Sequence, residues 1–92
     1  MEEIAIFWTD YMKYRLKLRD YDHATVEQVL RYSSERYLDT VTGRMVAVGR
    51  YANRLVMIPY ENDGSTVTPV TIHATNRQQI NSRLKSGRFL NE

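Results

Sequence analysis

Cysteine is absent from this chain of 92 residues, and proline and glycine are scarce, with two and four residues. Without cysteine there is no disulfide framework, no thiolate nucleophile and no zinc site built on cysteine ligands. No apolar run approaches the roughly 20 residues that a membrane-spanning helix requires, and the N-terminus lacks the basic start of a secretory signal. We therefore expect a single domain over residues 1–92, located in the cytoplasm and without a membrane partner.

Charge is distributed unevenly along the chain, although the net value is only +2. Residues 1–40 carry eight acidic and six basic side chains, a balance of −2, whereas residues 41–92 carry three acidic and seven basic ones, a balance of +4. Grouped arginines raise the local potential and suit a phosphate-bearing or acidic partner. They equally suit a solvated surface, and charge alone does not separate the two interpretations.

The first forty residues predict an extended lead-in, in which a short edge strand can form, followed by two short helices. The first helix, over residues 11–19, can be capped by Thr9 or Asp10, and it is expected to turn a mixed aromatic stripe toward a sheet. That stripe consists of Tyr11, Tyr14 or Arg15, Leu18 and Tyr21. The second helix begins after Asp22, a capping residue, and its buried face has the i, i+3, i+4 spacing of Val26, Val29 and Leu30.

Period-two alternation then predicts strands over residues 36–39, 44–51, 55–60 and 67–74. Pro69 places the first half of the last strand at an edge or a bulge. Thr75 and Gln78 form a capping-box pattern that begins a final helix, and Gly87 is its expected stop. The predicted class is therefore α+β, with two N-terminal helices, an antiparallel β-meander of about four strands and a C-terminal helix. All helices are expected on one face of the sheet.

Several short motifs follow one another in a recognisable order. They are Tyr11-x-x-x-Arg15-x-x-x-Arg19, Arg36-Tyr37-Leu38-Asp39, Gly43-Arg44-x-Val46-x-Val48-Gly49-Arg50, Arg54-Leu55-Val56 and the closing strand and helix. In this order the chain resembles the small bacterial proteins grouped with BrnT, which are toxins of type II toxin–antitoxin systems with a RelE-like ribonuclease fold. The resemblance implies RNA cleavage on an open sheet face and a cognate antitoxin that covers this face.

The chain also departs from that family's pattern. Tyr11 stands where such proteins often place a histidine, and only Ala74 and Arg77 correspond to the Ser-Ala-Arg ending of the family's last strand. The resemblance therefore leaves both the activity and its residues to be argued from chemistry.

A metal-independent ribonuclease must activate a 2′-hydroxyl and stabilise a charged phosphoryl transition state. Histidine has a pKa suited to proton transfer near neutrality, and arginine offers a permanently charged fork to phosphoryl oxygens. The catalytic candidates are therefore His73, Arg77 and Arg50, and the RNA-binding candidates are Arg54, Tyr60, Arg83 and Tyr51. Tyrosines can stack on RNA bases, although ordinary strand packing explains Tyr51 and Tyr60 as well, and His73 can be simply exposed.

Three functional hypotheses remain open at this level. The first is a ribonuclease toxin that uses neither a metal nor a cofactor, since H-E-x-x-H, P-loop and G-x-G-x-x-G motifs are absent. The second is a non-catalytic protein-interaction module of the same fold, and the third is an RNA-binding domain without turnover. The expected partners are an antitoxin, RNA, or a second copy of the chain in a two-fold dimer.

Overall fold

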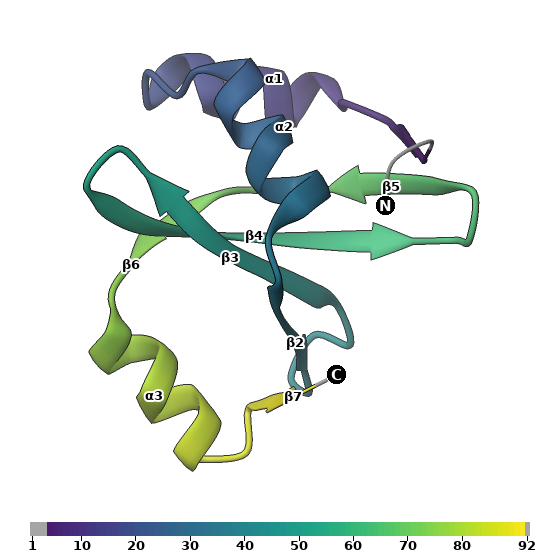
Figure 1. The fold of residues 1–92 in the computed structure, drawn as a ribbon. Helices are drawn as coiled ribbons and strands as arrows, with labels where there is room; N and C mark the ends of the chain where they lie inside the picture. Colours follow the sequence, from purple (N-terminus) through teal and green to yellow (C-terminus); the bar gives the residue numbers. More distant parts are fainter. Residues whose placement is uncertain (1–3, 92) are drawn as a thin grey trace.

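The computed structural model describes residues 4–91, which form three helices and a seven-stranded sheet (Figure 1). The helices are α1 (Asp10–Leu18), α2 (His23–Tyr32) and α3 (Arg77–Lys85). The strands are β1 (Ala5–Ile6), β2 (Glu35–Asp39), β3 (Met45–Tyr51), β4 (Arg54–Asn62), β5 (Thr66–Pro69), β6 (His73–Thr75) and β7 (Phe89–Asn91). This arrangement confirms the α+β class. Within residues 4–91, each helix is too short or too polar to cross a membrane.

The sheet has more strands than the predicted four-strand meander. Its order is β1-β5-β4-β3-β2-β7, with β6 also paired to β4, and β1 and β5 form a parallel pair. The run 67–74, predicted as one strand, is divided because the chain leaves the ladder after Pro69 and rejoins it at His73. A short N-terminal edge strand is present as β1, and β7 adds a strand that the sequence did not indicate.

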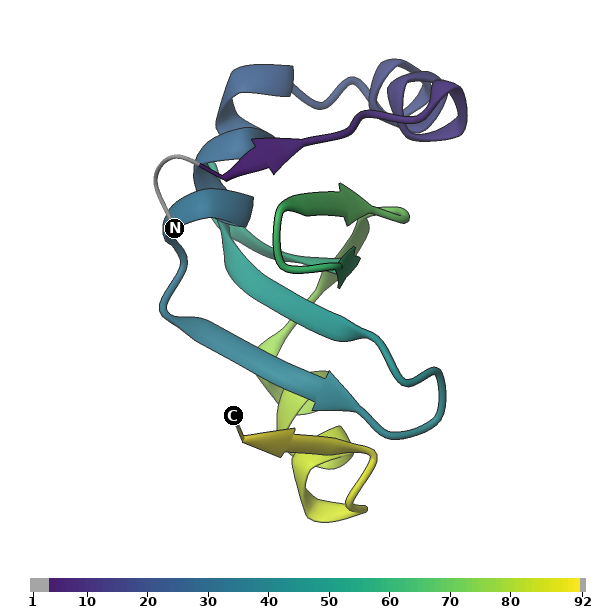
Figure 2. The same ribbon diagram turned by 90° about the vertical axis from the view of Figure 1, so that its right-hand side faces the viewer.

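Helices cover both faces of the sheet, so the prediction that all of them lie on one face is wrong. Figures 1 and 2 show α1 and α2 above the sheet and α3 below it. The reason lies in β3, where Ala47 packs into one cluster with α1 and α2 while Val46 and Val48 pack into a second with Ile80 of α3. A strand that is apolar on both sides needs a cover on both sides.

Helix α1 buries a different face from the predicted one. Its buried residues are Met12 and Leu16, one turn apart, whereas Tyr11, Tyr14 and Leu18 are exposed. The Thr9 hydroxyl accepts a hydrogen bond from the Met12 N–H at 3.0 Å, so Thr9 and not Asp10 is the N-cap of the two residues that the sequence allowed. Three residues of the expected stripe therefore point to solvent, whereas Tyr21, beyond the end of the helix, packs against the core.

Helix α2 follows its prediction closely. Asp22 caps it by accepting from the Thr25 N–H at 3.1 Å, and its buried residues are Val26, Val29 and Leu30. These side chains pack against β3, where Gly49 leaves room for Val29: a Cβ on Gly49 would lie 2.6 Å from Val29 Cγ1. The absence of a side chain at residue 49 therefore sets how closely α2 approaches the sheet.

Helix α3 begins one residue later than the predicted capping box. Asn76 is the N-cap, because its side chain accepts from the Gln79 N–H at 2.9 Å, while the Thr75 hydroxyl bonds to Gln79 Oε1 at 3.0 Å. Gly87, with φ of +83°, ends the helix as predicted and turns the chain into β7. Pairing of β7 with β2 returns the end of the chain to the sheet and anchors α3 beneath it.

Candidate active site

A pocket of about 180 Å³ lies on the face of the sheet that α3 covers. Its apolar wall includes Val46 of β3 and Met57 and Pro59 of β4. Its basic lining consists of Arg44, His73, Arg83 and Arg88. A concave site with an apolar floor and convergent cationic groups suits an anionic ligand that also has an apolar part.

His73 enters this pocket through the register of β6, which pairs it with Met57 and so places both side chains on the α3 face. The imidazole is half-buried, and Arg15 Nη2 lies 3.4 Å from its Nδ1. Because a guanidinium only donates, Nδ1 is the acceptor in this contact. Burial, followed by the charges of Arg15, Arg19 and Arg83, lowers the pKa of His73 below 6.5. The ring is therefore neutral at pH 7 and able to accept a proton.

Arg83 brings a second guanidinium to the pocket, and apolar groups hold it there. Its Cζ lies 5.6 Å from the centroid of the Phe89 ring, and its Nη1 lies 3.7 Å from Met57 Sδ. In residues 4–91 neither Arg83 nor Arg15 forms an ion pair with a carboxylate. Two guanidinium charges beside His73 therefore have no protein counter-ion in the part of the chain that the structure describes.

Arg88, in contrast, is fully engaged. Its Nε and Nη2 donate to the two carboxylate oxygens of Asp39, both at 3.1 Å, and Asp39 is only 5% exposed. Burial alone would raise the pKa of Asp39, but the hydrogen bonds from Arg88 and from backbone N–H groups outweigh it, and this pKa lies below 3.8. The ionised pair joins the turn before β7 to β2 and forms one wall of the pocket.

Two buried polar atoms next to His73 have no hydrogen-bond partner among the described residues: Thr71 Oγ1 and Arg15 Nε. Thr71 lines the pocket, and Arg15 Nη2 lies 3.4 Å from the carbonyl oxygen of Ile72, the residue before β6. A buried polar group without a partner costs about 1–3 kcal/mol, and such groups are typical of sites that a ligand or water completes. Both atoms can donate to a phosphoryl oxygen.

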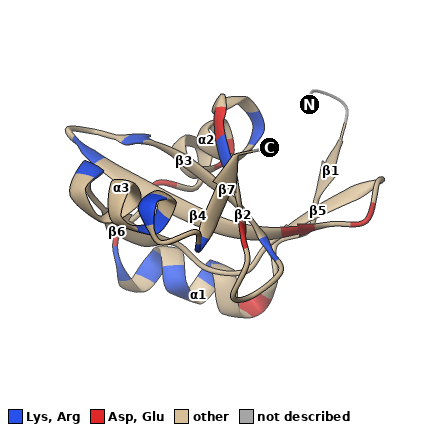
Figure 3. Cartoon of the chain, turned by 90° about the horizontal axis from the view of Figure 1, so that it is seen from below, with Lys and Arg blue, Asp and Glu red and all other residues tan. Residues whose placement is uncertain are grey.

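The surface around β6 is basic on both sides. Figure 3 shows bands of Lys and Arg on α1 and α3, and Figure 1 places β6 between these helices. Helix α1 carries three basic residues and one acidic residue, Asp10, and α3 carries three basic residues and no acidic one. The potential of both helices therefore adds at His73 and favours an anion there.

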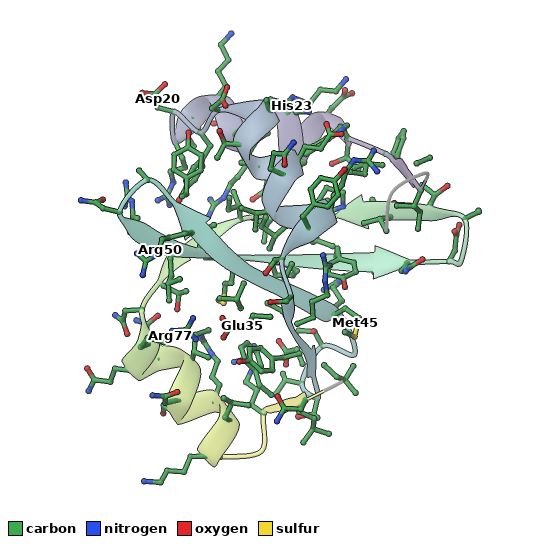
Figure 4. The ribbon with its side chains drawn as sticks, in the orientation of Figure 1. Asp20, His23, Glu35, Met45, Arg50 and Arg77 are labelled. Atoms are coloured by element: carbon green, nitrogen blue, oxygen red, sulfur yellow. The ribbon has the colours of Figure 1, made fainter. Side chains whose placement is uncertain are left out.

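The other predicted arginines lie outside the pocket. Arg77 is held by Glu35 through two hydrogen bonds of 2.5 and 2.7 Å, and Figure 4 shows the two side chains facing each other beneath the sheet. These hydrogen bonds outweigh burial and lower the pKa of Glu35 below 4.5. Arg50 and Arg54 are exposed at the β3–β4 hairpin. Arg50 shares the face of His73, but strand spacings place the two Cα atoms roughly 12 Å apart.

The tyrosines predicted to stack on RNA bases belong to the opposite face. Tyr60 is 3% exposed and its hydroxyl accepts from Arg36 Nη1 at 3.0 Å, so its ring offers no surface to a base. Tyr51 accepts from the Asp22 N–H at 2.5 Å and its ring meets the edge of Tyr21. Packing, the alternative that the sequence left open, therefore explains both residues, and the structure gives no support to base stacking by either ring.

Arg15 and Thr71 are the site residues that sequence reasoning missed. For Arg15 a signal existed, since the four-residue spacing of Tyr11, Arg15 and Arg19 puts them along one side of a helix. What the spacing does not show is that this side borders β6. Thr71 has no comparable signal, because a threonine in an apolar strand is an ordinary β residue.

Comparisons of the chain with models of protein families, with curated proteins and with solved structures find no match. The likeness to BrnT therefore remains an expectation from short motifs. In the described range 4–91, no three His, Asp or Glu side chains gather as the ligands of a metal ion would. The fold and the pocket together define an α+β protein with a cationic site around one neutral histidine.

The contact between Arg15 and His73 predicts how a substitution of Arg15 changes the pKa of His73. Replacing Arg15 with glutamine removes a positive charge 3.4 Å from Nδ1, so we expect the pKa of His73 to rise. An NMR pH titration of the His73 ring measures this pKa. The control is Lys13→Gln, which removes the same charge from an exposed position of the same helix. An equal rise in both variants would show that Arg15 acts only through the general charge of α1.

Proposed function

We propose that the protein is a metal-independent endoribonuclease of the toxin type that its motifs resemble, with His73 as the proton-transfer group. The observation that supports this most is the position of a neutral imidazole beside two guanidiniums, Arg15 and Arg83, that pair with no carboxylate within residues 4–91. Cleavage of a phosphodiester by its own 2′-hydroxyl needs a proton acceptor active near neutrality and cationic donors held in place.

The proposed steps use only these groups. A phosphate that enters at the edge of β6 attracts Arg15, whose 3.4 Å contact with His73 is at the long limit of a hydrogen bond. Nδ1 is then available to take the proton of the 2′-hydroxyl while the 2′-oxygen bonds to phosphorus. Arg15 and Arg83 stabilise the charge that develops on the phosphoryl oxygens. The bond from phosphorus to the 5′-oxygen breaks, and this oxygen takes a proton from water. The hydroxide that remains takes the proton from the His73 imidazolium, which returns the imidazole to its neutral form.

The products provide the direct test. We expect the purified protein, in EDTA, to cut single-stranded RNA and to leave 2′,3′-cyclic phosphate and 5′-hydroxyl ends, because the attacking oxygen belongs to the substrate. Mass spectrometry of the fragments identifies these ends. RNA with a 2′-deoxynucleotide at the cleavage position should stay intact. Cleavage of that RNA, or cleavage that requires an added divalent cation, would contradict the mechanism.

RNA binding without turnover is the second candidate, and one observation favours it. Arg15 donates to Nδ1, so a phosphate that leaves this contact in place would be bound but not attacked. The same assay separates the two: salt-dependent binding of RNA that stays intact supports the second candidate. If the protein neither binds nor cleaves RNA in this assay, the protein-interaction module is the remaining hypothesis.

A toxin of this kind would act on RNA in the cytoplasm and would be controlled by a cognate antitoxin covering the basic site. Growth arrest with loss of RNA on induced expression, relieved by co-expression of a neighbouring gene product, would support this role. The two-fold dimer also remains a prediction, and light scattering of the purified protein measures it.

A further inference from the structure

The outer side of α1 carries large apolar side chains that the fold leaves uncovered. Tyr11, Tyr14 and Leu18 are 56%, 59% and 59% exposed. The inner side of the same helix, with Met12 and Leu16, is buried against the sheet. The tyrosines therefore have no part in the core and are available to a binding partner.

Helix geometry joins this exposed stripe to the candidate active site. At about 100° per residue, Tyr11, Leu18 and Arg15 lie within one sector of the helix surface, and Tyr14 lies at its outer border. Tyr11 precedes Arg15 by four residues, so the two side chains are neighbours one turn apart. Because Arg15 contacts Nδ1 of His73, the stripe continues directly into the proposed cleavage site.

The charges that flank the stripe fit a nucleic acid. Arg15 and Lys17 lie on the two sides of the stripe, and Arg19 is the C-cap of α1. Lys13 lies on the opposite side of the helix, and Asp10 is the one acidic residue of α1. Basic side chains interleaved with exposed aromatic rings are the pattern that binds a single strand, since phosphates pair with the cations and bases stack on the rings. An acidic protein segment would match the charge as well, but it would not account for the continuity with His73.

We propose that Tyr11 and Tyr14 form a stacking platform for bases of single-stranded RNA next to the phosphate held by Arg15. This inference rests on the proposed function. It specifies that the substrate of the ribonuclease is unpaired RNA, in which the bases next to the cleaved phosphate lie against α1. It moves base stacking from Tyr51 and Tyr60 to the exposed rings of α1. A base inside a duplex cannot present its face to a tyrosine, so duplex RNA would not use this platform.

Binding of RNA that cannot be cut tests the platform separately from catalysis. The probe is a fluorescein-labelled single-stranded RNA with 2′-O-methyl groups, and fluorescence anisotropy gives the dissociation constant. We expect Tyr11→Ala to weaken binding about 10-fold, within the range for loss of one stacked base, and Tyr11→Phe to bind like wild type. The matched control is Tyr32→Ala, since Tyr32 is 60% exposed but lies on α2.

A second measurement distinguishes stacking from a change in folding. RNA that lacks the base at the stacked position should bind wild type and Tyr11→Ala with equal affinity. Tyr11 has no base to stack on in that RNA, so its removal costs nothing. If Tyr11→Ala and Tyr14→Ala bind like Tyr32→Ala while the wild type still cuts RNA, the platform is refuted and the ribonuclease proposal stands. If the wild type binds no RNA at all, both proposals fail and a protein partner becomes the expected occupant of the stripe.

Discussion

Replacing His73 with alanine is expected to slow RNA cleavage by about 100-fold to 10,000-fold, the usual contribution of a positioned general base. His73 is the titratable side chain that lines the pocket and contacts Arg15. The loss should be in the rate at saturating RNA, with binding of uncut RNA much less affected. Single-turnover kinetics on a defined RNA measures the rate, and a thermal melt confirms that the variant remains folded.

The dependence of the cleavage rate on pH tests whether His73 is the group that accepts the proton. Its pKa is lowered from 6.5 by burial and by the neighbouring arginines, so the neutral form of the free protein persists below pH 6.5. A general base with this lowered pKa gives a rate that rises with pH and has the midpoint of its rise below pH 6.5, and this rise should vanish in His73→Ala. A rise that remains in the variant would assign the proton transfer to another group.

Arg77→Ala is the matched control for the catalytic prediction. Arg77 is also a catalytic candidate from the sequence, but its guanidinium forms two hydrogen bonds to Glu35 and lies outside the pocket lining. We expect the variant to lose some stability and to keep most of its cleavage rate. A loss as large as that of His73→Ala, in a folded protein, would instead mean that the ion pair opens when RNA binds.

Replacing Gly49 with alanine is expected to destabilise the protein by about 2 kcal/mol, the usual cost of forcing an extra methyl group into a packed core. A Cβ at this position would lie 2.6 Å from Val29 Cγ1 and 3.2 Å from Val29 Cγ2. Valine cannot move aside easily, since its branched side chain has one strongly preferred rotamer in a helix. The clash outweighs the small gain that alanine usually brings over glycine within a strand. Thermal unfolding should show a fall in Tm of roughly 10 °C.

A double-mutant cycle shows whether Val29 is the cause. Gly49→Ala combined with Val29→Ala should lose less stability than the sum of the two single variants, because the shortened side chain makes room for the new methyl group. The control is Gly43→Ala, where no atom lies within 4 Å of the added Cβ and the cost arises from φ of +77°. Its effect should add to that of Val29→Ala without coupling. Equal coupling in both cycles would show that contact with Val29 is not responsible.

Sequence reasoning was most successful where short-range chemistry decides the structure. The caps at Thr9 and Asp22, the buried residues of α2 and the stop at Gly87 depend on spacings of four residues or fewer, and the structure confirms them. It was least successful for α1. Two sets of residues in this helix have helical spacing, the aromatic set with Tyr11 and Tyr14 and the pair Met12 and Leu16. The sequence prediction placed the aromatic set on the buried face, but the structure buries the pair.

The site was anticipated only in part, for a related reason. His73 was named because of its chemistry, and it lies in the pocket with Arg83. Arg15 was not assigned to the site because it is 58 residues from His73 along the chain. Tyr60 was assigned to the site because its chemistry suited RNA, and the structure buries it on the other face. The residue type determines the chemistry of which a side chain is capable, whereas the fold determines which other groups that side chain contacts.

The sequence by itself determined the α+β class, the start of α2, the approximate extent of α3, and the kind of chemistry available to a chain with no cysteine and with only two histidines. Only the tertiary structure decided that α3 covers the face opposite α1 and α2, and that α1 turns Arg15 toward β6 while leaving Tyr11 in solvent. The physical reason is that periodicity reports which residues of one element share a face. Which face becomes the interior is decided by the apolar surface that other elements bring to it.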